Sequence, residues 1–125
     1  MKVLVVAHLS SGFIAAALEG DLDMLKFLKE TECPFYSGTK VEVVIAAAKG
    51  GHLETLKWLK EEDCLLPRKA YSAACESGLK SVKVLRWLRG NGCLWNSKAH
   101  MAATQNGNFE ALKWLYKTSK VHYWS

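Results

Sequence analysis

One short pattern, repeated four times along the chain, limits what this sequence can fold into. Its clearest copy is Gly51–Leu59, which reads Gly-His-Leu-Glu-Thr-Leu-Lys-Trp-Leu and is followed by Cys64. In every copy an Ala-Ala pair precedes a glycine, and these glycines are Gly20, Gly51, Gly78 and Gly107. A pattern that recurs at a short period is typical of a repeat array, in which each unit buries its apolar side only against its neighbours. The sequence therefore predicts a stack of four similar units.

The spacing between the aromatic residues of successive copies gives the length of the unit. Steps of 31, 29 and 27 residues separate these aromatics, which are Phe27, Trp58, Trp87 and Trp114. We take 27 residues as the basic unit, with extra residues after Cys33 and after Gly78. Leucines recur every third residue beside each aromatic, as on one face of a helix, and a glycine readily ends the alanine-rich helix before it. Each unit is therefore predicted to be a short alanine-rich helix, a glycine turn, a longer amphipathic helix and a loop.

These features predict an all-α fold, a helical-repeat solenoid of four helix-turn-helix units in a single domain over residues 1–125. The unit boundaries are expected near 10–38, 39–66, 67–95 and 96–120. A short N-terminal cap over residues 1–9 and a C-terminal tail over residues 121–125, one step into the next loop, complete the chain. The aromatic column is expected to lie in the core, because it shares the apolar side of each helix with the leucines.

The residues around the second glycine turn resemble a known family. The run Ala46-Ala47-Ala48-Lys49-Gly50-Gly51-His52-Leu53-Glu54 is similar to the Ala-Ala-x-x-Gly-His core of ankyrin repeats. The resemblance is closer still to the short ankyrin-like repeats of large DNA viruses and protists, whose last element is matched by Cys33-Pro34-Phe35 and by Cys93-Leu94-Trp95-Asn96. It covers roughly Ser10 to Lys120. The unit is about six residues shorter than the common 33-residue repeat, and no Thr-Pro-Leu-His opens the first helix.

The resemblance implies a protein-binding module whose partner lies on the concave face formed by the first helices, and it implies that His52 bridges backbone groups between units. Within each first helix, the residues nine and two positions before the glycine are two turns apart and share one face. These residues are Glu42, Lys49, Lys69, Glu76, Lys98 and Gln105. They are polar and differ between units, as expected for an exposed binding face. Trp95, in a connector, either packs across the loops or contacts the partner.

The charge distribution supports an alternative function. Residues 1–63 carry seven lysines and arginines against ten acidic residues, a net charge of −3, whereas residues 64–125 carry ten against two, a net charge of +8. Such asymmetry indicates an acidic protein or a nucleic-acid backbone as partner of the C-terminal half. The expected contacts are Arg68, Lys83, Arg86, Arg89 and Lys113. The alternative is therefore a subunit of a ribonucleoprotein or another complex that contains nucleic acid.

Neither the cysteines nor the histidines form a catalytic or metal-binding pattern. Cys33, Cys64 and Cys93 occupy equivalent positions in successive units, so they should lie about 10 Å apart, too far for a disulfide or a shared metal ion. The histidines form no ligand pair at helical spacing. The single glycines lack the clustering of a phosphate-binding loop. We therefore expect buried, reduced cysteines and a non-catalytic protein without cofactor or metal.

The ends of the chain suggest a location and a further partner. No secretory signal and no apolar run long enough to span a membrane is recognisable, so an intracellular and cytoplasmic protein without membrane contact is expected. The fourth unit keeps the internal Leu112, Trp114 and Leu115 pattern, but only a short aromatic tail follows it. Because a repeat array leaves the apolar side of its last unit uncovered, we expect another protein or a second copy of the chain to cover it.

Overall fold

The computed structural model describes residues 12–31, 37–93 and 97–124, and these ranges contain helices and no strand. The prediction of an all-α fold is confirmed. The first helix covers residues 12–19. The later elements are α2 (Leu22–Glu30), α3 (Ser37–Gly50), α4 (Leu53–Glu61), α5 (Lys69–Ala74), the 3₁₀-helix η1 (Gly78–Lys80), α6 (Ser81–Gly90), α7 (Lys98–Gln105) and α8 (Phe109–Trp124). The predicted N-terminal cap lies outside the described residues.

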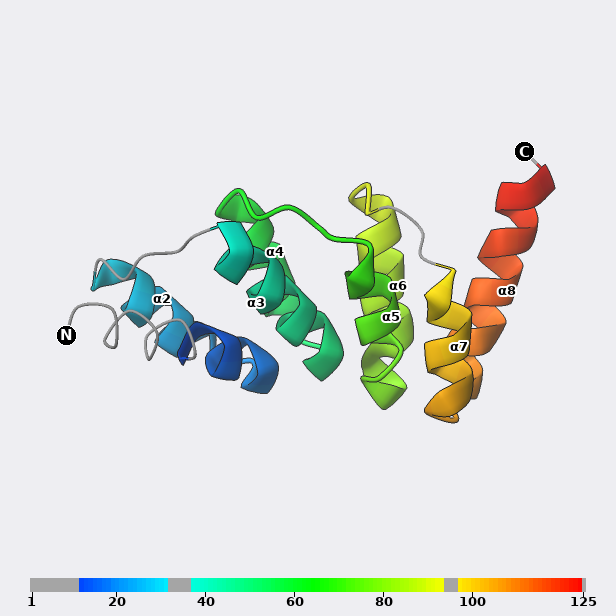
Figure 1. Cartoon of the computed structure of the whole chain (residues 1–125), viewed down its shortest axis with the longest axis horizontal. Coiled ribbons are helices and arrows are strands. Elements are labelled where there is room, and N and C mark those ends of the chain that lie inside the picture. The colour runs from blue at the N-terminus through cyan, green and yellow to red at the C-terminus, as the bar shows by residue number, and fades with distance from the viewer. Residues whose placement is uncertain (1–11, 32–36, 94–96, 125) are drawn as a thin grey trace.

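The helices form consecutive antiparallel pairs that stand in a row (Figure 1). Contacts between successive pairs create two layers. In the inner layer α3 packs against α5 and α5 against α7, while in the outer layer α4 packs against α6 and α6 against α8. Alanines make the inner layer possible, because their small side chains let neighbouring helices approach closely. The fully buried ones in these helices include Ala47, Ala48, Ala70, Ala74, Ala99 and Ala103.

The leucines of the outer helices fill the space between the layers, but the aromatics only partly do so. Leu56 and Leu59 of α4 are fully buried, and so are Leu85 and Leu88 of α6. The expectation that the aromatic column belongs to the core is wrong for Phe27, which is 57% exposed.

Three tryptophans, Trp58, Trp87 and Trp114, are half-buried against the edge of the core. The reason is geometric. Each aromatic directly precedes a buried leucine, and successive residues of a helix are turned by about 100° from one another. The aromatic rings therefore lie on the flanks of the outer helices.

The glycine turns hold successive pairs together. All four predicted turn glycines have a left-handed φ, between 61° and 75°, so their turn-forming role is confirmed. A Cβ atom on Gly20 would lie 2.5 Å from Nδ1 of His52, which fills the space above that turn. The same ring makes a hydrogen bond 2.8 Å long between Nε2 and the carbonyl oxygen of Leu18 in the preceding pair. The bridge that the resemblance implies for His52 is present.

Four helix boundaries differ from the expected ones. The helix α3 begins at Ser37, before the expected boundary between the first and second units at residues 38 and 39. We expected the third inner helix to reach Ser77, but α5 ends at Ala74, and the two extra residues after Gly78 form η1 together with it in place of the start of the outer helix. The helix α8 continues to Trp124, so residues 121–124 are helical and not a loop. No glycine or proline follows Leu115 to end this helix, unlike the connectors after α2, α4 and α6.

Replacement of Gly50 by alanine tests the close approach at the second turn. In an ordinary helix this change is stabilising by up to about 1 kcal/mol. Here the added methyl group would lie 2.5 Å from Cδ2 of His52 and closer still to the carbonyl oxygen of Leu18. We expect Gly50→Ala to lower the free energy of unfolding by about 1–3 kcal/mol, measured by urea denaturation.

The matched control is Gly90→Ala at the end of α6, where a Cβ atom would meet nothing within 4 Å. This variant should be neutral or slightly more stable than the unmodified protein. Equal effects of the two substitutions would contradict the packing described for the second turn.

Candidate functional site

The structure brings four of the six residues predicted for the concave face into one groove. Lys69 and Glu76 from the α5 segment face Lys98 and Gln105 of α7 across an open groove of about 360 Å³. All four side chains are exposed. Glu42 and Lys49 are also exposed but lie on α3, outside the lining of this groove. Trp95 lies outside the described residues.

The middle of the groove is built by residues that the sequence analysis missed. Ile45, Ser72 and Met101 line it, each six positions before the glycine of its unit. A residue at this position lies three after the first and four before the second predicted face residue, so all of them share one helical stripe. The same count of residues before each glycine could have identified them. The predicted face included only the positions nine and two before each glycine, so the position between them was left out.

The groove is apolar in the middle and charged at its ends. Ala73, Ala102 and the half-buried Ile45 of α3 line it together with Met101, of whose surface 62% is exposed. Lys69 and Lys98 are the first residues of α5 and α7, so two ammonium groups lie at one end. The opposite end carries the carboxylate of Glu76 and the amide of Gln105.

The predicted basic contacts lie on a different surface. Lys83, Arg86 and Arg89 are exposed on α6, and Lys113 is exposed on α8, so these four belong to the outer layer. Arg68, also exposed, directly precedes α5. The ammonium group of Lys113 lies 4.7 Å from the centre of the Phe109 ring and 4.0 Å from a carboxylate oxygen of Glu110. Four of the five predicted basic contacts therefore lie on the outer helices of the C-terminal half, whereas Arg68 lies next to Lys69 at the start of α5.

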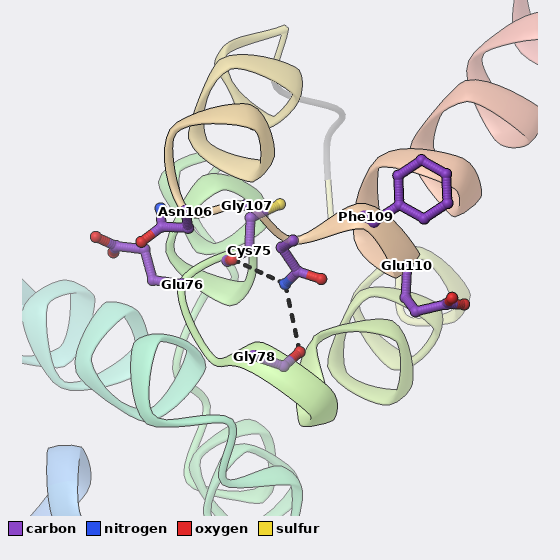
Figure 2. A pocket seen from close by; sticks show the side chains of 8 residues that line it. Cys75, Glu76, Gly78, Asn106, Gly107, Phe109 and Glu110 are labelled. Atoms are coloured by element: carbon purple, nitrogen blue, oxygen red, sulfur yellow. Dashed lines mark hydrogen bonds between the residues drawn. The ribbon is translucent and has the colours of Figure 1, made fainter.

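A second cavity, of about 380 Å³, lies where the turn of the fourth pair meets the turn of the third (Figure 2). It contains both acidic residues of the C-terminal half, Glu76 and Glu110. Figure 2 shows their side chains pointing in opposite directions, so the two carboxylates do not converge on one point.

The centre of this cavity is occupied by a structural bridge. The Asn108 amide group donates to the carbonyl oxygen of Cys75 at 3.0 Å, to that of Gly78 at 3.3 Å and to Oγ of Ser81 at 2.6 Å. Its Oδ1 accepts a hydrogen bond from the backbone N–H of Ala111 and so caps α8. The first two bonds are dashed in Figure 2. Asn108 follows its turn glycine as His52 does, so the cavity belongs to the joint between pairs.

The described cysteines have the character of buried apolar residues. Cys64, Cys75 and Cys93 are buried thiols. Burial raises the pKa of Cys75 to about 12 and that of Cys93 to about 11, and it also raises the pKa of Cys64. Among the described side chains, no group of three His, Cys, Asp or Glu residues is placed to hold a metal ion. Cys33 lies outside the described residues.

No protein-family model, curated protein or solved structure matches this sequence. Within the described part of the chain, no helix has the combination of length and apolar character that crossing a membrane requires. The groove and the charge distribution are therefore the features that bear on function.

Replacement of Asn108 by aspartate tests the bridge in Figure 2. Aspartate keeps the oxygen that caps α8 but cannot donate to the carbonyl groups of Cys75 and Gly78, and it places a negative charge against them. We expect a loss of about 1–3 kcal/mol in the free energy of unfolding, measured by urea denaturation.

The matched control replaces aspartate by asparagine at the equivalent position of the first unit, Asp21. Asp21 accepts from the backbone N–H of Met24 at 3.1 Å and is exposed. Since asparagine and aspartate cap helices about equally well, Asp21→Asn should change stability by less than about 0.5 kcal/mol. A neutral Asn108→Asp variant would contradict the bridging role.

Thiol reactivity tests the burial of the cysteines. The thiolate is the reactive form, and the raised pKa values keep Cys64, Cys75 and Cys93 protonated at neutral pH. In a Cys33→Ser variant, we expect these three thiols to react with a chromogenic disulfide reagent only slowly near pH 8 and rapidly once urea unfolds the chain. Rapid reaction of the native variant would contradict their burial.

Proposed function

We propose that this chain is a short ankyrin-like solenoid of four helix pairs that acts as a non-catalytic module and binds a protein partner in the groove between α5 and α7. The observation that carries the proposal is the lining of this groove. Residues at equivalent positions of two successive inner helices converge on an open, mostly apolar trough with charged ends. The side chains of Lys69, Glu76, Met101 and Gln105 in this lining are exposed, so a partner in the groove would contact them.

The architecture supports binding to a preformed surface. The alanine-rich inner helices are packed directly against one another, and fully buried leucines fix them to the outer layer. Folding therefore already meets the cost of ordering the groove, and less of the binding free energy is lost when a partner associates. A small trough with an apolar middle suits a few side chains of a partner, anchored by contacts at both charged ends.

A second candidate function is binding to a nucleic-acid backbone through the outer layer. The observation that favours it is the exposed row Lys83, Arg86 and Arg89 on α6, a helix without any acidic residue. The net charge of +8 over residues 64–125 adds long-range attraction for phosphate. This candidate predicts affinity for generic RNA that falls steeply with salt, whereas binding of a protein in the groove is much less dependent on salt.

Charge reversal in the groove tests the proposed function. We expect the double variant Lys69→Glu/Lys98→Glu to weaken binding of a protein partner by about 1–2 kcal/mol or more, since two charged contacts at one end of the groove are inverted. The partner is first captured from the native source with the unmodified chain and identified by mass spectrometry. Its affinity for each variant is then measured by isothermal titration calorimetry.

The matched control is Lys26→Glu/Lys57→Glu, which makes the same charge change on the exposed side of α2 and α4. This control should bind the partner almost as well as the unmodified chain. An effect of the control pair alone would place the partner on the outer layer. Loss of RNA binding in a variant with Arg86 and Arg89 reversed, without any groove effect, would favour the second candidate.

A further inference from the structure

The charges of the groove have an order that constrains what can bind there. Lys69 and Lys98 lie at the end where α5 and α7 begin, and Glu76 lies at the end where they finish. Glu76 lies seven residues after Lys69 and two past the end of α5, which at the rise of a helix corresponds to about 10 Å along its axis. The ligand must therefore offer a negative group and a positive group at about this separation, with an apolar group between them.

The groove excludes several other occupants. A nucleic-acid backbone would bring phosphate groups against the carboxylate of Glu76, which lines the groove and is exposed. A uniformly acidic peptide would meet the same repulsion, and a uniformly basic one would be repelled by Lys69 and Lys98. The volume of about 360 Å³ is at the small end of the range for ligand sites and admits a few side chains, not a folded domain.

We propose that the groove binds an extended segment of the partner in which an acidic and a basic residue are four positions apart, with an apolar residue midway. In an extended chain residues i, i+2 and i+4 point to the same side, and the outer two are about 13 Å apart. The long side chains of Lys69 and Glu76 can lean outward and bridge the difference from the helical distance. The acidic residue pairs with Lys69 and Lys98, and the basic residue pairs with Glu76.

The middle of the groove fits the apolar residue of this segment. Ala73 and Ala102 line it with small side chains, and Met101, which also lines it, is exposed. An unbranched thioether adapts to side chains of different shape, so this position selects for apolar character more than for one residue type. The charges at the ends then fix the register of the segment and the direction in which it runs. This inference rests on the proposed function, because it specifies the partner for the same groove.

The test is a selection of peptides from a random displayed library on the full chain, repeated on a charge-swapped variant, Lys69→Glu/Lys98→Glu/Glu76→Lys. We expect the unmodified chain to select peptides with opposite charges four residues apart and an apolar residue midway. The swapped variant should select the same spacing with the order of the charges reversed. Each variant should prefer its own peptides at least tenfold, measured by fluorescence anisotropy. Circular dichroism establishes that the variants keep their helix content.

The variant Lys26→Glu/Lys57→Glu serves as the control and should select the same peptides as the unmodified chain. Peptides that bind the charge-swapped variant as tightly as the unmodified chain, but do not bind a Met101→Asp variant, would overturn this inference. They would still support the groove as the binding site. Peptides that bind all groove variants equally would overturn both the inference and the proposed site. A selection that yields no peptide dependent on the groove would also overturn the inference.

Discussion

The structure depends on the joints between helix pairs, which are closest at the first two glycine turns. At the second turn, the His52 ring fills the space above Gly20 and reaches the carbonyl oxygen of Leu18, and this arrangement leaves no room for a Cβ atom on Gly20 or Gly50. The residues of the first two turns therefore set a short distance between their pairs, whereas a Cβ atom on Gly78 or Gly107 would meet nothing within 4 Å. The buried alanines of the inner helices suit such a short distance, and the buried leucines of the outer helices close the core behind them.

The joints between pairs use different side chains for the same task. At the fourth turn Asn108 takes the position that His52 has at the second, and it reaches back to the carbonyl groups of Cys75 and Gly78. Within the third unit, where the two extra residues and Gly78 form η1, Ser81 donates to the carbonyl oxygen of Ala74 at 2.6 Å and itself accepts from the Asn108 amide of the fourth unit. A carbonyl oxygen left exposed at the end of one inner helix is the common acceptor. Polar contacts between outer helices, such as the ion pair of Lys29 with Glu62, are partly exposed and add little.

The sequence predicted the all-helical structure and the turn glycines because both follow from local chemistry: a 3.6-residue apolar period and a residue that tolerates a left-handed φ. It did not predict the exposure of Phe27, because a step of one residue around a helix moves a side chain from the core to its flank. It placed residues 121–124 in a loop because the preceding units end there, but α8 contains no residue that stops it. The polar ends of the groove were predicted from spacing. Its apolar middle, with Ile45 and Met101, was not, since the predicted face included only the positions nine and two before each glycine.

The exposure of the charged groove residues has a consequence for recognition. His52 and Asn108, which reach back to the preceding pair, directly follow turn glycines, whereas the charged and amide side chains that line the groove are exposed on or just after the inner helices. Substitutions in the groove can therefore change its charge order without moving the helices. Along the inner layer the order already differs: α3 carries Glu42 before Lys49, whereas α5 carries Lys69 before Glu76. Under the proposed function, a partner bound in the groove of α5 and α7 by its charge order would therefore meet like charges at the equivalent positions of α3.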